Sequence, residues 1–217
     1  AGDEVFGGYN RYVFAPKAWS RVSGWPATLR TGAAAAMRAV PTGPWDRLES
    51  ALAKSLGRQG IRLPGEKIHK LARVLPATSR RELYEGLAAC WMDPPLADRH
   101  AESVREWYTI PAALEVPGNY ARLMMYLDSV SYLADDILVK VDRASMAVGL
   151  ESRVPLLDHR LVEFMNGLPL QHKISAGQSK RILRDIAFAR VPRALLDRPK
   201  AGFGVPIDSW LRGPLRD

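Results

Sequence analysis

Apolar residues recur at a helical spacing along most of the chain. Leu123, Leu127 and Val130 are separated by four and three residues, for example, which places them on one face of a helix. The pattern predicts helices at about 45–56, 64–75, 79–91, 96–108, 119–150, 159–167, 179–189 and 207–211. The Ala-rich run 33–36 also favours a helix over low complexity. The longest element, 119–150, is either continuous or interrupted.

Start and stop signals support several of these boundaries. Pro44 suits the first turn of a helix that Gly57 ends. Ser79 and Glu82 have the spacing of a capping box, and Asp158 is a good N-cap for the helix that follows it. No alternating strand pattern, hairpin Asn-Gly pair or regular repeat occurs. The sequence therefore predicts a mainly α chain.

The composition narrows the class of protein. The chain has 217 residues, of which 47% are hydrophobic and 25% charged, and this balance is that of a globular protein with one domain or two small ones. No apolar run approaches the roughly 20 residues of a membrane helix. The single cysteine, Cys90, excludes an internal disulfide and favours a reducing, cytoplasmic location. The four scattered histidines offer no zinc-ligand spacing, and we interpret them as structural or surface residues.

The net charge of +8 is concentrated near the C-terminus. Between Lys173 and Arg216 there are ten basic residues and three acidic ones. Such an excess attracts nucleic acid, anionic lipid or a phosphorylated small molecule. No Walker loop, Rossmann fingerprint or Ser/His/Asp set is present to decide among these partners.

Two adjacent carboxylates, Asp3 and Glu4, lie among glycines at the start of the chain. On a glycine-flanked turn they would suit Mg²⁺, which takes one or two carboxylates and completes its shell with water and phosphate oxygens. A solvated acidic turn is the simpler interpretation of these two residues alone. The constrained opening resembles a site loop more than a natural terminus, so we expect the chain to be part of something longer.

Acidic residues in the predicted long helix have a simpler explanation. Asp128, Asp135 and Asp142 are seven residues apart and share a face, which we interpret as the polar face of an amphipathic helix. Asp136 and Lys140 have the spacing of a helical ion pair. Farther on, Glu151 and Arg153 lie among apolar residues. This mixture predicts a partly buried charge cluster with an architectural role.

Two lysines are candidates for binding phosphate. Lys180 and Arg184 lie one turn apart near the predicted start of a helix, just after Gly177, where they form either a phosphate site or a solvated face. Lys200 lies in the Gly- and Pro-rich segment 198–206. Such a lysine is poorly suited to core packing and well suited to following negative charge on phosphate oxygens, although a plain surface loop is an equal alternative.

Four ordered motifs together resemble one family, and residues 15–115 contribute little to the match. The opening Ala1-Gly2-Asp3-Glu4-Val5-Phe6-Gly7-Gly8-Tyr9 resembles the end of the Ser-Gly-(Asp/Glu)-x-x-Asp-Glu-(Leu/Val)-Phe-Gly-Gly-Tyr motif of glutamine-dependent asparagine synthetases. The stretch 132–158 resembles the signature of their synthetase domain through Tyr132-Leu133, Asp136, Leu138, Lys140, Asp142-Arg143, Ser145-Met146, Leu150-Glu151, Arg153, Pro155 and Leu157-Asp158. The remaining motifs follow in the expected order as Lys180, Ile182-Leu183-Arg184, Arg198-Pro199-Lys200, Gly202-Phe203-Gly204-Val205-Pro206 and Trp210-Leu211-Arg212-Gly213.

The resemblance implies a function and roles for single residues. In this family a glutaminase with a catalytic cysteine releases ammonia from glutamine. An α/β synthetase domain of the ATP-pyrophosphatase type, which is like the adenine nucleotide alpha hydrolases, uses ATP and Mg²⁺ to make β-aspartyl-AMP, which ammonia converts to asparagine. By resemblance, Asp3 is the magnesium–pyrophosphate carboxylate and Lys200 is the catalytic lysine that contacts the phosphates. We expect Lys180 to contact the nucleotide phosphates as well, whereas Glu151, Arg153 and Asp158 match architectural positions.

The chain also departs from the family pattern. It lacks the Ser-Gly-Gly-x-Asp-Ser pyrophosphate loop, the Ser-Gly-(Asp/Glu) that precedes the opening motif, and the glutaminase. We therefore expect residues 1–217 to be the helical, C-terminal portion of the synthetase domain, and to be inactive alone because they cannot hold ATP. The expected partners are aspartate, ATP and glutamine-derived ammonia, with no specific nucleic acid and no membrane, and a homo-oligomer could form.

Two alternatives remain open. The parent could form another amide, as β-lactam synthetases, lasso-peptide cyclases and polysaccharide amidotransferases of this family do. Alternatively, the chain could be a non-catalytic basic helical binding module, which the charge of +8 would suit.

Overall fold

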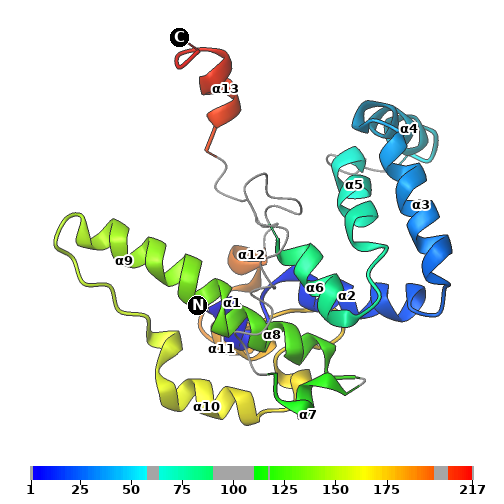
Figure 1. Cartoon of the computed structure of the whole chain (residues 1–217). Coiled ribbons are helices and arrows are strands. Elements are labelled where there is room, and N and C mark those ends of the chain that lie inside the picture. The colour runs from blue at the N-terminus through cyan, green and yellow to red at the C-terminus, as the bar shows by residue number, and fades with distance from the viewer. Residues whose placement is uncertain (1, 58–63, 90–109, 117, 198–204, 217) are drawn as a thin grey trace, which may run out of the picture. The chain divides into compact units, whose positions relative to one another are not determined.

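Helices make up the regular structure of the chain (Figure 1). The structure, a computed structural model, describes residues 2–57, 64–89, 110–116, 118–197 and 205–216, and no strand occurs among them. This confirms the predicted mainly α character. The chain divides into two compact units, 1–181 and 182–217, and each is described by itself.

The first unit contains most of the helices. They are α1 (Gly2–Phe6), α2 (Asn10–Val22), α3 (Ala27–Ala39), α4 (Thr42–Ser55), α5 (Pro64–Val74), α6 (Arg80–Ala88), α7 (Ala112–Glu115), α8 (Tyr120–Val130), α9 (Val139–Met146) and α10 (His159–Gly167), with a π-helical segment (Leu133–Leu138) and two 3₁₀ turns (Pro155–Leu157 and Leu170–His172). Almost all of α11 (Arg181–Phe188), together with α12 (Arg193–Leu196) and α13 (Ile207–Arg212), belongs to the second unit.

The main core of the first unit is built around α8. This helix is apolar on several sides, and Leu123, Met124 and Leu127 are among its buried residues. Helices α1, α2 and α7 pack directly against it, and buried side chains of α6 join the same core. A helix that is apolar on most of its circumference is stable only when it is covered on all sides, which explains its central position. A smaller core lies where α3 packs on α5, around Ala34 and Ala72.

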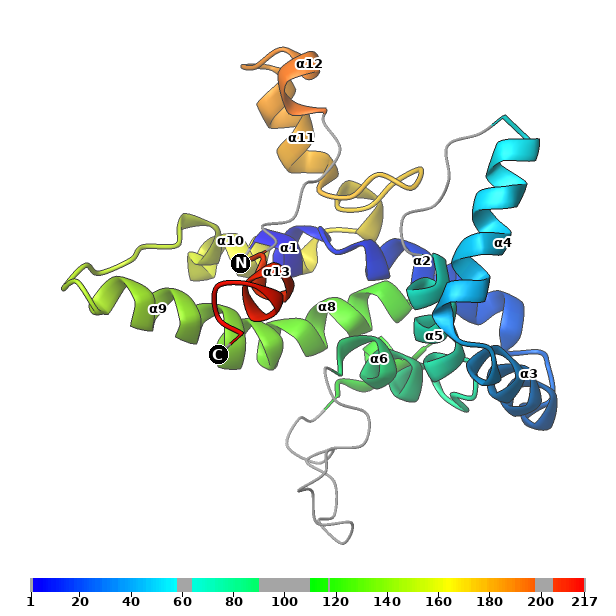
Figure 2. The same ribbon diagram turned by 90° about the horizontal axis from the view of Figure 1, so that it is seen from above.

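The predicted helix 119–150 is interrupted. It consists of α8, the π-helical segment and α9, which run on as one extended rod (Figures 1 and 2). At the junction the hydroxyls of Ser129 and Ser131 donate to the carbonyls of Met125 and Leu127, at 2.8 and 2.6 Å. Such back-bonding competes with the helical ladder and bends helices, and π-helical turns are a recognised form of interruption. The rod ends in a turn with Gly149 at a positive φ of 70°.

Several predicted helix boundaries are confirmed by specific contacts. The Ser79 hydroxyl accepts from the Glu82 backbone N–H at 3.1 Å, as its capping spacing predicts. The Asp158 carboxylate caps α10 by accepting from the Arg160 N–H at 3.0 Å. The predicted helix at 96–108 lies outside the described residues.

Other expectations need correction. Helix α6 ends at Ala88, three residues short of the predicted end, because the backbone of Ala89 is extended. Helices α1 and α2, and all of α3 except 33–36, were not predicted. Tyr12 and Ala15 on α2 are both buried, so the apolar face of this helix is real even though Pro16 lies inside it. Among the described residues, no helix has the length and apolar character needed to cross a membrane.

Candidate functional site

Asp3 on α1 forms an ion pair with Lys180, which lies far along the chain. Oδ1 of Asp3 and Nζ of Lys180 are 3.0 Å apart, and the two side chains are 31% and 32% exposed. The sequence interpretation of this opening as a turn is wrong, because residues 2–6 form a short helix. Gly7, at a φ of 72°, ends that helix in the left-handed conformation that glycine adopts most easily, and the Gly8 N–H donates to the Asp3 carbonyl at 2.7 Å.

Gly8 leaves the space in which Asp3 and Lys180 meet. A Cβ built on Gly8 would lie 1.9 Å from Oδ1 of Asp3 and 2.3 Å from Cε of Lys180. Any other residue would have to displace the pair. The second glycine of the Gly7-Gly8 sequence is therefore explained by the close approach of two charged side chains to the backbone.

Lys180 reaches Asp3 from the end of a tight loop. The Arg181 N–H donates to the Lys173 carbonyl at 2.9 Å, which closes the loop, and Ser175 and Gln178 exchange two backbone hydrogen bonds inside it. Lys180 has a φ of 55° and precedes α11, so the helix begins two residues later than predicted. Arg184 has a different partner, Asp197, at 2.5 Å within the second unit.

Glu4 lies next to Asp3 in the sequence but in a different environment. Its side chain is buried, with 1% of the residue exposed. Its Oε1 accepts a hydrogen bond from the Tyr9 hydroxyl at 2.7 Å. Burial raises the pKa of Tyr9 above its usual value, and the adjacent carboxylate of Glu4 raises it further. The two carboxylates that the sequence suggested as a joint metal site therefore differ in their access to solvent. Asp3 is partly exposed, whereas Glu4 is buried.

A second acidic residue, Asp128, is fully buried between α2, α6 and α8. The hydroxyls of Tyr12 and Tyr84 donate to its carboxylate, the latter at 2.8 Å. Arg11 completes the cluster, with Nη2 2.8 Å from Oδ1 and Nε 3.1 Å from Oδ2. Burial, followed by the negative charge of Asp128, raises the pKa of both tyrosines. The prediction that Asp128 belongs to a solvated polar face is wrong, because this position faces the core.

Aromatic rings extend this cluster towards the α1–α2 turn. The Arg11 guanidinium lies 4.2 Å from the ring centroid of Tyr9, within range of a cation–π contact. The ring of Tyr9 meets Tyr12 and Tyr132 edge to face, at 5.6 and 6.1 Å between centroids. These contacts hold the turn after α1, and with it Asp3, against the start of the π-helical segment.

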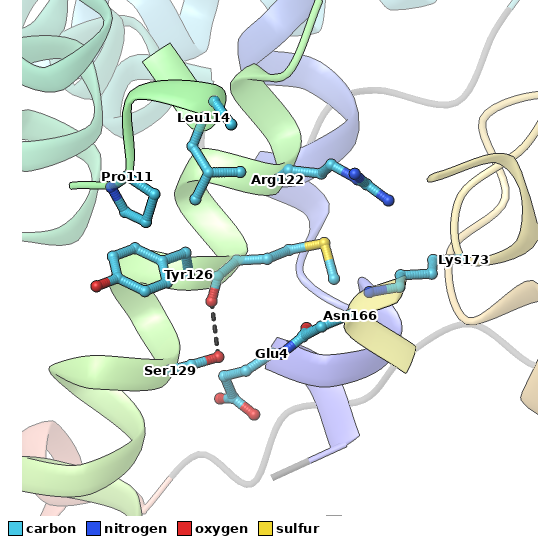
Figure 3. Close-up of a pocket in the computed structure, with 10 residues that line it drawn as sticks. Glu4, Pro111, Leu114, Arg122, Tyr126, Ser129, Asn166 and Lys173 are labelled. Atoms are coloured by element: carbon cyan, nitrogen blue, oxygen red, sulfur yellow. Dashed lines mark hydrogen bonds between the residues drawn. The ribbon is translucent and has the colours of Figure 1, made fainter. Parts of the chain in front are cut away.

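A pocket of about 320 Å³ opens on the other side of Glu4 (Figure 3). It is lined by residues of α1, α7, α8 and α10 and by Lys173 at the start of the tight loop. Lys173 is buried, with 2% exposed, and burial lowers the pKa of its ammonium to about 8, with a further contribution from the nearby Arg122. Sequence reasoning did not identify this pocket, because its charged residues, Glu4, Arg122 and Lys173, lie in three distant parts of the sequence.

The remaining candidate residues from the sequence have different outcomes in the structure. Glu151 and Arg153 pair at 2.7 Å but are largely exposed, so the predicted partly buried cluster is wrong for the described residues. Asp136 and Lys140 form the expected ion pair at 2.8 Å. Lys200 lies outside the described residues. Within the described ranges, no group of three His, Cys, Asp or Glu side chains is arranged to hold a metal ion.

Comparisons with known proteins agree on one family. The asparagine synthase family model matches residues 1–217. A putative asparagine synthetase (glutamine-hydrolyzing) of Mycobacterium bovis is 32% identical over 97% of this chain, and asparagine synthetase (glutamine-hydrolyzing) 1 of Bacillus subtilis is 28% identical over 99%. The human asparagine synthetase (glutamine-hydrolyzing) is 38% identical, over 37% of the chain and 15% of its own length.

The chain spans only 29% and 31% of the length of the mycobacterial and Bacillus relatives. No solved structure matches it. The family match nevertheless covers the whole chain and includes the segment that carries Asp3 and the segment that carries Lys180. The chain therefore belongs to the asparagine synthase family.

Proposed function

We propose that residues 1–217 are the C-terminal portion of a synthetase domain that forms asparagine from aspartate, ATP and ammonia, and that other parts of the protein supply the pyrophosphate loop and the glutaminase. The observation that carries the proposal is the Asp3–Lys180 pair, with 3.0 Å between the charged atoms and Gly8 leaving the space around it. The names of the relatives, which are asparagine synthetases (glutamine-hydrolyzing), support the choice of reaction.

The proposed reaction has two steps. An oxygen of the aspartate β-carboxylate attacks the α-phosphorus of ATP, the bond from that phosphorus to the bridging oxygen breaks, and pyrophosphate leaves. The nitrogen of ammonia then attacks the β-carbonyl carbon of the aspartyl-AMP, the carbon–oxygen bond to AMP breaks, and the nitrogen loses a proton. The chain's own residues would bind and neutralise the phosphates in the first step.

Asp3 and Lys180 suit the two charges of a metal-bound pyrophosphate. A carboxylate that is about one third exposed fits Mg²⁺, which accepts a single protein carboxylate when phosphate oxygens and waters complete its shell. Mg²⁺, when bound, would neutralise charge on the pyrophosphate. The Lys180 ammonium lies beside that carboxylate, so it would contact phosphate oxygens from the same side. Both groups are accessible enough to exchange their mutual contact for a ligand.

We assign Lys200 the catalytic role, as a cation that stabilises the charge developing on the phosphate oxygens in the adenylation transition state. In the full-length protein, Lys200→Ala should lower aspartate-dependent exchange of pyrophosphate into ATP about 100-fold, the scale of losing one electrostatic transition-state contact. Lys54→Ala, which removes an exposed lysine of α4 outside the family motifs, is the matched control and should retain exchange. Near-normal exchange in the Lys200 variant would remove this role.

Product analysis tests the reaction itself. Chromatography of a reaction containing aspartate, glutamine, ATP and Mg²⁺ should show asparagine, AMP and pyrophosphate in equal amounts. An enzyme that does not use aspartate as a substrate but amidates another carboxylic acid would contradict the proposed substrate. It would not affect the assignment to the family.

A further inference from the structure

The pocket beside Glu4 has no part in the reaction described above, and its composition is unusual. Its walls are mainly apolar and include Leu114 and Met125. Two cations, Arg122 and Lys173, nevertheless line it (Figure 3). A volume of about 320 Å³ is at the lower end of the range for pockets that hold small organic ligands.

Lys173 is the first sign that the pocket binds an anion. The residue is 2% exposed, and none of the described residues gives its ammonium a hydrogen bond or an ion pair. A buried charge without a partner is costly, and buried ammonium groups are normally paired with a carboxylate or another anion. Its lowered pKa, about 8, reflects that cost and still leaves the group mostly charged at pH 7.

Arg122 is the second sign. One of its guanidinium nitrogens, Nη2, donates to the Leu168 carbonyl, and this contact fixes the group at the pocket. The guanidinium is close enough to Lys173 to lower its pKa through charge repulsion. Two like charges in a poorly solvated space repel each other, and an anion between them would turn that repulsion into attraction. The planar guanidinium matches a carboxylate particularly well.

Glu4 and the apolar walls limit what the anion can be. In Figure 3 Arg122 and Lys173 lie on one side of the pocket, and the carboxylate of Glu4 lies with Ser129 on another. The lining therefore carries two positive charges and one negative charge, so a single negative charge balances it. Leu114 and Met125 offer apolar surface to the rest of the ligand. These features favour an organic monocarboxylate over inorganic phosphate, which carries more charge and no apolar body.

We propose that this pocket binds a small organic monocarboxylate, whose carboxylate contacts Lys173 and Arg122 and whose apolar body packs against Leu114 and Met125. The inference does not depend on the reaction proposed above. The ligand would also lie beside Glu4, which lines the pocket and directly follows Asp3 on α1.

The test is calorimetric titration of the full-length protein with isovalerate at pH 7.5, in the absence of ATP and aspartate. We expect saturable binding with one site per chain. Lys173→Met and Arg122→Met should each weaken it about 10-fold or more, on the scale of a charge-assisted hydrogen bond. Lys17→Met removes an exposed lysine of α2 that does not line the pocket and should leave binding unchanged.

Proton uptake provides a second measurement that does not depend on the variants. An anion beside Lys173 raises the pKa of its ammonium, so binding at pH 8.5 should take up protons, with the heat depending on the buffer. Tyr126, Arg122 and Glu4 are the other ionisable groups that line the pocket.

Three results would overturn the inference. They are the absence of saturable isovalerate binding, binding that survives Lys173→Met at full strength, and inorganic phosphate binding as tightly as isovalerate at equal ionic strength. Because no result requires ATP turnover, failure here is distinguishable from failure of the proposed reaction, which pyrophosphate exchange measures separately.

Discussion

Asp3 and Asp128 show how one residue type serves two purposes in the same unit. Each carboxylate pairs with a cation, Lys180 at 3.0 Å and Arg11 at 2.8 Å. Asp128 is fully buried and also receives two tyrosine hydroxyls, so it has no capacity or access for a ligand. Asp3 is about one third exposed and has one cation beside it. A buried, saturated carboxylate fixes helices, whereas an accessible, lightly paired one can bind.

The largest effect should follow from Asp128→Ala. The variant leaves the Arg11 guanidinium and two tyrosine hydroxyls without their common partner in the core, so the free energy of unfolding should fall by about 3–5 kcal/mol. Denaturant unfolding of the full-length protein, followed by tyrosine and tryptophan fluorescence, measures the change. Asp136→Ala, at an exposed pair, should cost no more than about 0.5 kcal/mol. Equal effects at both positions would remove the distinction drawn above.

Asp3→Asn should give the opposite result, with activity lost and stability kept. Aspartate-dependent pyrophosphate exchange should fall about 100-fold, since the carboxylate that would hold Mg²⁺ is gone. The midpoint of unfolding should change little, because ion pairs exposed to this degree contribute about 0–1 kcal/mol. An Asp3→Asn variant with a clearly lower unfolding midpoint, or one that retains exchange, would show that Asp3 has a structural role like that of Asp128.

The third prediction compares Asp128 with Lys173, a buried charged residue that has no such set of hydrogen-bond and ion-pair partners in the described part of the chain. Burial lowers the pKa of Lys173 to about 8, below the value of about 10.4 expected in the unfolded chain. Between these values the unfolded state binds more protons, so this lysine makes stability rise as pH increases from about 8 towards 10. Lys173→Met should therefore be more stable than wild type at pH 7, and the difference, on the order of 1–3 kcal/mol, should shrink at pH 10. A difference that stays constant with pH would contradict the assignment.

The smallest expected effect is that of Gly8→Ala. The added Cβ would overlap Oδ1 of Asp3 and Cε of Lys180, and both side chains are partly exposed and can shift. We expect exchange to fall about 10-fold with only a small loss of stability. Gly32→Ala is the matched control, because nothing lies within 4 Å of the new Cβ and the residue is inside α3. That control should gain up to about 1 kcal/mol of stability from helix propensity.

The sequence predicts the helices better than the burial of their charged residues. Apolar spacing identified α4, α5 and α10, since one face of each helix carries the signal. Asp128 shares a heptad position with two exposed acids, and periodicity alone assigned all three to solvent. The apolar run 123–127 immediately before Asp128 was the available sign of burial.

The candidate site was predicted in part for a similar reason. The motifs around Asp3 and Lys180 are local and can be read from the sequence, whereas their meeting at 3.0 Å depends on Gly8 and on the loop that Arg181 closes. The pocket with Arg122 and Lys173 depends entirely on how α1, α8 and α10 pack. No spacing rule links residues that only the tertiary fold brings together.

The tyrosines around Asp128 have an optical consequence. Burial and the neighbouring negative charge raise the pKa of Tyr12 and Tyr84, so both rings stay neutral in alkaline solution while exposed tyrosines ionise. Their phenolate absorption would appear only when α2 and α6 separate from α8. The cluster that holds the core together thus also carries an intrinsic chromophore that distinguishes the intact core from the opened one.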